Sequence, residues 1–150
     1  MSTLLKNKDA GFNFKTIEEF EAGLVLTGQE VKSLKSKRAS LKGAFVSIKN
    51  NEAWIKKMHI PSYAKASLMS LKNYNPEKDR KLLLNKKQIS YLASKTNEKG
   101  LTIIPISLYT RRRLVKLKIA LVKGKRKFDK RQDIKKRDIQ RDIQRKLKSY

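Results

Sequence analysis

The stretch Ile104–Leu121, IPISLYTRRRLVKLKIAL, contains two segments in which apolar residues occupy every second position. The first runs from Ile104 to Leu108, and the second runs from Val115 to Leu121 with lysines between its first apolar residues. A period of two is typical of a strand with one face in a core. The stretch therefore predicts an antiparallel hairpin with its tip at Thr110–Arg113. Pro105 lacks an amide hydrogen, so its strand should be an edge strand or should bulge there.

A second hairpin is predicted around Asn50-Asn51. These residues separate Phe45–Lys49 from Glu52–Met58, and asparagine tolerates the positive φ that a tight hairpin turn requires. We expect Trp54 to pack in the core. Weaker patterns predict a strand over Gly28–Leu34 and another that includes Phe12, Phe14 and Ile17.

One helix is well marked. Apolar residues between Ile89 and Thr96 recur with helical spacing, Asn85 suits the N-cap with a glutamine three residues later, and Gly100 follows the end. A shorter helix is predicted over Ile17–Leu26, with acidic residues in its first turn. The stretch 64–80 shows little pattern and predicts a long surface loop.

The composition is strongly basic, with 38 Lys or Arg against 13 Asp or Glu among 150 residues and a net charge of +25. Such a charge favours polyanionic partners, with nucleic acid first and an anionic membrane surface second. The chain has no Cys and one His, which excludes disulfides, thiolate zinc sites, a cysteine nucleophile and a histidine-rich metal site. No apolar run approaches the length that spans a bilayer. We expect a cytoplasmic protein with no cofactor and no membrane partner.

The charge is concentrated at the end of the chain, where Lys123–Tyr150 holds thirteen Lys or Arg and four Asp. Ile139, Ile143 and Leu147 form a thin helical stripe that cannot stabilise a helix alone. We assign 1–122 to a single globular domain and 123–150 to a tail that is disordered when free and helical against an ordered anionic surface. A solvated charged tail with no docking site is the alternative.

Several short antiparallel strands with few helices predict a β-rich fold. Because closure removes exposed strand edges, we expect an oligonucleotide-binding-like barrel with two or three short helices. Basic clusters at Arg80-Lys81, Thr110–Arg113 and Lys123–Lys127 suit phosphate contacts. Composition and pattern therefore predict a basic RNA- or DNA-binding barrel with an extension.

Carboxylates offer the main route to catalysis. Glu18, Glu19, Glu21 and Glu30 lie close in sequence, and a metal-dependent nuclease would need two or three of them to converge. Helix capping and charge balance explain them at least as well, and His59 is more economically structural. We predict that the protein is not an enzyme.

Longer strings carry a resemblance to a known family. They are residues 20–34 (FEAGLVLTGQEVKSL), 80–86 (RKLLLNK), 99–102 (KGLT), 123–125 (KGK) and 129–131 (DKR). In this order they resemble small protein B, the family of SsrA-binding proteins of bacteria. The similarity runs from about Asn7 to Leu147.

The resemblance implies a non-enzymatic RNA-binding adaptor of trans-translation, the rescue of stalled ribosomes. A barrel of the oligonucleotide-binding type would bind the tRNA-like domain of transfer-messenger RNA and stand in for the codon–anticodon interaction at the small-subunit decoding centre. The tail would enter the empty mRNA channel as a helix. Alanyl-tRNA synthetase and elongation factor Tu would be indirect partners.

Three other functions stay open beside the one the resemblance implies. A constitutive ribosomal-type barrel would bind ribosomal RNA permanently. A barrel-fold nuclease would need divalent metal. A membrane-surface role is the weakest, because the tail stripe lacks bulky aromatic residues.

The resemblance also implies site residues. Glu21, Leu83 and Asn85 match family positions that hold the tRNA-like domain, although an N-cap role explains Asn85 equally well. Arg80 and Lys81 are expected to contact phosphates. The remaining expected contacts are Lys123 and Lys125 for RNA and, for the ribosome, Phe128, Asp129, Lys130, Arg131, Lys135, Lys136, Arg137, Arg141 and Arg145.

Overall fold

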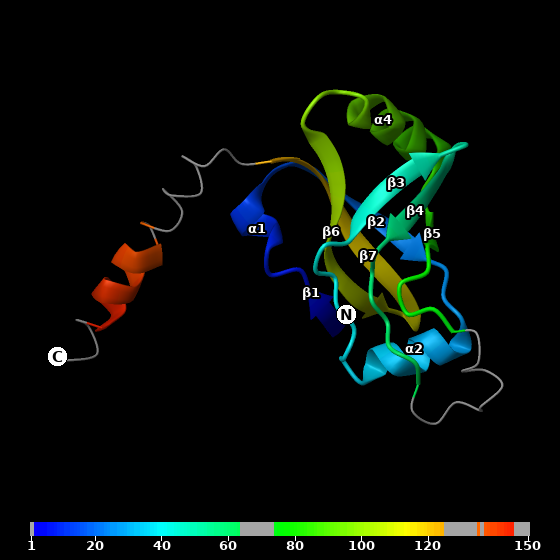
Figure 1. Cartoon of the computed structure of the whole chain (residues 1–150), viewed down its shortest axis with the longest axis horizontal. Helices are drawn as coiled ribbons and strands as arrows, with labels where there is room; N and C mark the ends of the chain where they lie inside the picture. Colours follow the sequence, from blue (N-terminus) through cyan, green and yellow to red (C-terminus); the bar gives the residue numbers. More distant parts are fainter. Residues whose placement is uncertain (1, 64–73, 125–134, 136, 146–150) are drawn as a thin grey trace.

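The computed structural model describes residues 2–63, 74–124, 135 and 137–145. Its elements form one β-rich body followed by helical residues in the tail (Figure 1). In chain order they are β1 (Ser2–Lys6), α1 (Ala10–Asn13), β2 (Phe14–Leu24), α2 (Gly28–Lys35), β3 (Phe45–Lys49), β4 (Glu52–Lys56), β5 (Arg80–Leu83), α4 (Lys86–Thr96), β6 (Leu101–Arg111) and β7 (Leu114–Gly124).

The strands close into a barrel, as predicted. Their order is β1-β6-β3-β4-β5-β2-β7, and β7 pairs again with β6 to close the ring. Along one edge, β6 pairs with two strands in succession. Ile103 pairs with β3, and Ser107–Thr110 pair with β1. Closure leaves few unpaired edges, which limits unwanted strand pairing.

Both predicted hairpins are confirmed. Strands β6 and β7 are joined by Arg112 and Arg113, with φ of 50° and 69°. Asn50 and Asn51, with φ of 53° and 61°, join β3 to β4. Two successive positive φ values fit the right-handed twist of the flanking strands. The register also shifts just after Pro105, at the bulge that the missing amide hydrogen predicts.

The predictions of a helix over 17–26 and of a strand over 28–34 were wrong. The first segment lies mostly in a strand, and the second lies in a helix. Residues Phe14–Leu24 form β2, because they pair with β7 along most of their length and with β5 at their end. Residues Gly28–Lys35 form α2, which begins with a reciprocal capping box between Thr27 and Glu30. Long-range pairing and one capping box outweighed the local pattern.

Two smaller expectations are also corrected. Trp54 is half-buried and outside the core, because the alternation of β4 turns Ala53 and Ile55 inward instead. Phe12 lies in the short helix α1, and the strand starts at Phe14. Of the predicted loop 64–80, residues 64–73 lie outside the described part, 74–79 form neither helix nor strand, and Arg80 begins β5.

The marked helix is confirmed as α4. The Oδ1 atom of Asn85 accepts a hydrogen bond from the amide of Gln88 at 2.8 Å, and the Gln88 side chain accepts one from the amide of Asn85. Leu92 is fully buried beneath the helix. Both the cap and the apolar face were readable because they are local features of the chain.

The core fills the barrel and continues on one outer patch. The inward residues of β7 include Leu117, Ile119 and Leu121. They pack in one core with residues from all six remaining strands and from α2 and α4. Ala120 and Val122 face outward and are covered by Ala10 of α1. Among the described residues, Glu21 on the outer face of β2 and Leu83 on β5 remain exposed.

Candidate nucleic-acid interface

The structure brings Leu83 beside the strand that carries Glu21. Leu83 of β5 pairs with Gly23 of β2, and its side chain is 56% exposed. Because side chains two apart on a strand share a face, Glu21 lies on the same face as Gly23. Asn85 follows two residues after Leu83, at the start of α4. Two segments distant in the sequence therefore meet here, because Leu83 lies beside the strand that carries Glu21 and Asn85 follows at the end of the strand.

Gly23 allows β5 to approach β2 closely. A Cβ atom at this position would lie 3.2 Å from the Cβ atom of Leu83. A larger residue would therefore push Leu83 away from β2. The absence of a side chain here lets an exposed leucine lie flat beside the glutamate strand.

Asn85 retains a free donor although it caps α4. The cap uses the Oδ1 atom and the backbone amide. Among the residues the structure describes, Nδ2 donates no hydrogen bond. The capping role and an RNA-binding role are therefore compatible in the same side chain.

The structure does not support the expected contact between Arg80 and an RNA phosphate. Its side chain is 1% exposed and forms an ion pair with the buried Glu30. The guanidinium also donates to the carbonyl oxygens of Met58 at 2.7 Å and Pro76 at 2.9 Å. With its donors occupied inside the protein, Arg80 cannot reach a phosphate. Its neighbour Lys81 points to the other face of β5, where its side chain is 43% exposed and lies 3.6 Å from Glu52.

Glu30 lies at the centre of this buried network. Burial disfavours its charged form, but hydrogen bonds from the Thr27 amide and Arg80, with the charges of Arg80 and Lys78, lower its pKa overall. The Lys78 amine lies 3.4 Å from Oε1. Glu30 thus links α2 to β5 as an ionised, buried structural residue.

Glu21 is in a different environment. Its side chain is 42% exposed, and its Oε2 atom accepts a hydrogen bond of 2.5 Å from the hydroxyl of Tyr109. The Nη1 atom of Arg111 lies 3.7 Å from the same oxygen. Burial and the hydrogen bond to Glu21 raise the pKa of Tyr109 to about 12. Neither Tyr109 nor this use of Arg111 was predicted, because β6 and β2 meet only in the barrel.

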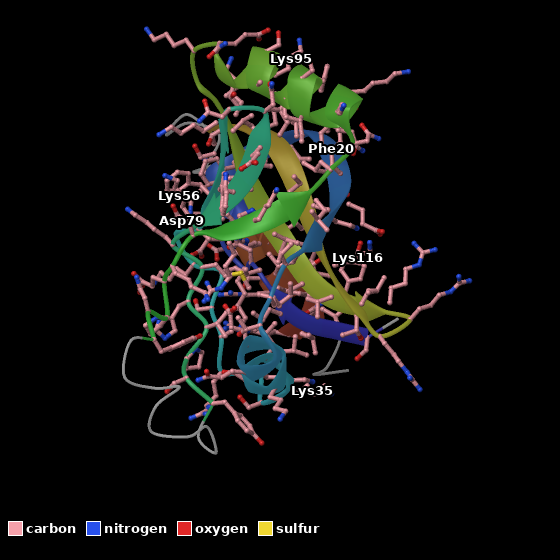
Figure 2. All side chains as sticks on the ribbon, turned by 90° about the vertical axis from the view of Figure 1, so that its right-hand side faces the viewer. Phe20, Lys35, Lys56, Asp79, Lys95 and Lys116 are labelled. Carbon is pink, nitrogen blue, oxygen red and sulfur yellow. The ribbon has the colours of Figure 1, made fainter. Side chains whose placement is uncertain are left out.

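An aromatic pair between β2 and α4 was also missed. The rings of Phe20 and Tyr91 lie 6.1 Å apart, and the amine of Lys95 lies 5.8 Å from the Tyr91 ring. Figure 2 shows Phe20 on the barrel below α4, which carries Lys95. Tyr91 is 38% exposed, and exposed rings beside cations suit base stacking. An exposed tyrosine on a lysine-rich helix was the available signal.

The predicted tail residues are only partly within the described structure. Lys123 is exposed at the end of β7, which continues to Gly124. Residues 135 and 137–145 are helical and exposed, and the guanidinium of Arg137 lies 5.0 Å from the Phe12 ring. Lys135, Arg141 and Arg145 lie in this helical part, whereas Lys125, Phe128, Asp129, Lys130, Arg131 and Lys136 lie outside the described residues.

The carboxylates do not converge. Within the described ranges, no group of three or more His, Cys, Asp or Glu residues could hold a metal ion. Glu30 is buried with Arg80, while Glu19 lies 3.7 Å from the Lys118 amine on the surface. His59 lies 3.8 Å from Glu77. In the same part of the chain, no helix has the length and apolar character needed to cross a membrane.

Comparison with known proteins identifies the family. The profile of the SmpB protein family matches residues 4–149. The chain belongs to the SmpB family. The SsrA-binding protein of Treponema denticola is 48% identical over 97% of this chain and 92% of its own. That of Neorickettsia sennetsu is also 48% identical, over 92% of each chain.

A solved structure supports the same assignment. A chain of the structure described as "tmRNA-SmpB: a journey to the center of the bacterial ribosome" is similar to this protein with a TM-score of 0.68. The two are 33% identical, and the similarity covers 87% of this chain and 93% of that one. The family resemblance and the barrel fold are therefore confirmed.

Proposed function

We propose that the protein binds the tRNA-like domain of transfer-messenger RNA and brings it to stalled ribosomes in the cytoplasm, without catalysing a reaction. Family membership over nearly the whole chain carries this proposal. The face formed by Glu21, Leu83 and Asn85 supports it, because an acceptor, an exposed apolar side chain and a free amide donor suit bases and ribose.

The positive residues around this face would supply affinity. Lys81 beside Leu83 and Lys123 with Lys125 at the end of the barrel are assigned to RNA phosphates, whereas Arg80 is not. Phosphate contacts position RNA without reading its sequence. Selectivity for the tRNA-like domain would then come from the Glu21, Leu83 and Asn85 face.

The deciding experiment is equilibrium binding to the tRNA-like domain with excess ordinary tRNA as competitor at moderate salt. A complex that survives the competitor supports recognition of this RNA's special shape. Displacement in proportion to tRNA concentration would leave only the electrostatic contribution and would favour a constitutive ribosomal-RNA-binding protein. Such a protein would also sediment with all ribosomes, stalled or translating.

We further propose that the tail 123–150 acts on the ribosome, in the mRNA channel beside the decoding centre. The exposed basic helix at 137–145 supports this, since Ile139 and Ile143 are 59% and 52% exposed. The residues assigned to this role are Phe128, Asp129, Lys130, Arg131, Lys135, Lys136, Arg137, Arg141 and Arg145. Truncation after Gly124 should preserve most binding to the tRNA-like domain and abolish peptide tagging on stalled ribosomes. Normal tagging by the truncated protein would remove the tail from the mechanism.

A further inference from the structure

Tyr109 connects two strands that do not pair with each other. Strand β7 lies between β6 and β2, with Lys116 opposite Tyr109 and Lys118 opposite Glu21. Tyr109 faces outward, yet it is only 5% exposed, and its hydroxyl crosses β7 to reach Oε2 of Glu21. A mostly covered tyrosine therefore contacts a surface carboxylate from the far side of an intervening strand.

The two oxygens of Glu21 are used unequally. Both Tyr109 and Arg111 engage Oε2. Across the residues that the structure describes, Oε1 has neither a hydrogen bond nor an ion pair. The amine of Lys118, the register partner, lies 3.7 Å from Glu19 instead. An ionised carboxylate can accept hydrogen bonds on both oxygens, so Oε1 is an available acceptor.

We propose that Tyr109 is a positioning residue for RNA recognition: it holds Oε2 of Glu21 so that Oε1 accepts a hydrogen bond from a base amino group or a ribose 2′-hydroxyl. The inference rests on the proposed function. A phosphate would be repelled by the carboxylate, whereas an amino group or hydroxyl donates to it. Fixing the side chain before binding reduces the conformational entropy lost when the complex forms.

Arg111 contributes differently from Tyr109. Its side chain is 59% exposed, and its 3.7 Å separation from Oε2 is an ion-pair distance rather than a good hydrogen bond. Exposed ion pairs are weak and are screened by salt. Tyr109, with a short hydrogen bond and little freedom to move, therefore fixes the carboxylate more strongly than Arg111 does.

The test is a double-mutant cycle with Tyr109→Phe, Glu21→Ala and the combined variant, each measured for binding to the tRNA-like domain and for urea unfolding. Tyr109→Phe should weaken binding by up to about tenfold, the cost of ordering one mobile side chain when the complex forms. In the Glu21→Ala background the same change should alter the dissociation constant less than about twofold, because independent effects would add and coupled effects do not. Wild-type affinity in Tyr109→Phe, or an equal loss in both backgrounds, would overturn the proposal.

Tyr74→Phe is the matched control. The Tyr74 hydroxyl donates to the carbonyl of Ile60 at 2.6 Å and does not contact Glu21. This variant also loses a tyrosine hydroxyl, here from a half-buried ring, and should bind RNA like the wild type. A loss equal to that of Tyr109→Phe would attribute the effect to the barrel's stability and overturn the positioning role.

Two further measurements keep the proposal testable if Tyr109→Phe folds poorly. Glu21→Asp retains the charge but withdraws the carboxylate from Tyr109, so RNA affinity should fall and the pKa of Tyr109, followed by tyrosinate absorbance, should move toward 10. Unchanged affinity in Glu21→Asp would contradict the proposal. Failure of the proposed function would appear separately, as a wild-type protein that does not prefer the tRNA-like domain over tRNA.

Discussion

Glu30 and Glu21 differ in burial although both lie in the string 20–34 that resembles the family. The Glu30 side chain is 1% exposed and forms an ion pair with the buried Arg80. The Glu21 side chain is 42% exposed, and within the described residues Tyr109 and Arg111 engage one of its oxygens, Oε2, and nothing engages the other. A buried carboxylate with all its partners inside the protein stabilises the fold, whereas a half-exposed carboxylate with an open oxygen can bind a partner.

The same difference separates neighbouring residues on β5. Arg80 and Leu82 turn into the protein, whereas Lys81 and Leu83 reach the surface. String similarity alone treats all four residues as equally informative about function. The alternation of the strand divides them into fold residues and contact residues.

Substituting each glutamate by alanine should give opposite results. Glu30→Ala leaves Arg80 buried and unpaired, so the free energy of unfolding should fall by about 3–5 kcal/mol in urea titrations. Glu21→Ala breaks an exposed ion pair and leaves the Tyr109 hydroxyl without its partner, so it should lower the free energy of unfolding by only about 1–2 kcal/mol while weakening RNA binding. Comparable stability losses in the two variants would remove the distinction. Glu52→Ala, which breaks an exposed pair with Lys81, is the control for the stability effect of losing a surface carboxylate.

The buried glutamate should also control stability in acid. Because its pKa is lowered from 4.5 in the folded state, the stabilisation is present above that value and is lost as pH falls through the folded-state pKa. Glu30→Gln should reduce the slope of stability against pH in this acid range by up to about 1.4 kcal/mol per pH unit. Chemical denaturation at several pH values gives the slope. The same slope in Glu30→Gln as in the wild type would contradict the assignment, and Glu52→Gln should leave the slope unchanged.

Glu21 should affect the pH dependence of stability at alkaline pH, through its hydrogen bond with Tyr109. The pKa of Tyr109 rises from 10.0 to about 12 in the folded protein, so its contribution is complete below pH 10 and is lost as pH rises through 12. The partial exposure of Glu21 makes this contribution smaller than that of Glu30. Tyr109→Phe should reduce the fall in the free energy of unfolding between pH 10 and pH 12, as followed by circular dichroism. An unchanged alkaline profile would show that Tyr109 ionises without affecting folding.

The smallest expected effect concerns a surface lysine of β5. Lys81→Gln should weaken RNA binding modestly and reduce the log–log dependence of affinity on salt by about 0.7–0.9, the value for one phosphate contact. Unfolding should change by less than about 0.5 kcal/mol because the residue is half-exposed. Fluorescence anisotropy at several salt concentrations measures the slope. An unchanged slope would place Lys81 outside the phosphate contacts, and Lys35→Gln on α2 serves as a control cation away from β5.

Local chemistry explains which elements were predictable. Asn50-Asn51 and the cap at Asn85 specify their structures through neighbouring residues, and both predictions are confirmed. The Thr27-to-Glu30 capping box was equally local, but it was overlooked because alternation in 28–34 indicated a strand. The start of β2 at Phe14 and Ile17 was predicted as a strand, but the rest of β2 was not, since its conformation depends on pairing with β5 and β7.

The amino-acid sequence by itself determined the family, the closed β-rich barrel, the two hairpins, the capped helix α4 and the strongly basic charge. The hairpins, the helix and the charge depend on residue types and short spacings, whose physical effects act within one turn or one strand. The family was inferred from longer strings, and the barrel from the number of short strands. Only the tertiary structure decided that Glu30 and Arg80 are buried together, that Leu83 lies beside Gly23, and that Tyr109 reaches Glu21. The reason is that burial and contacts across the barrel depend on which distant segments pack together, and that is set when the strands close the ring.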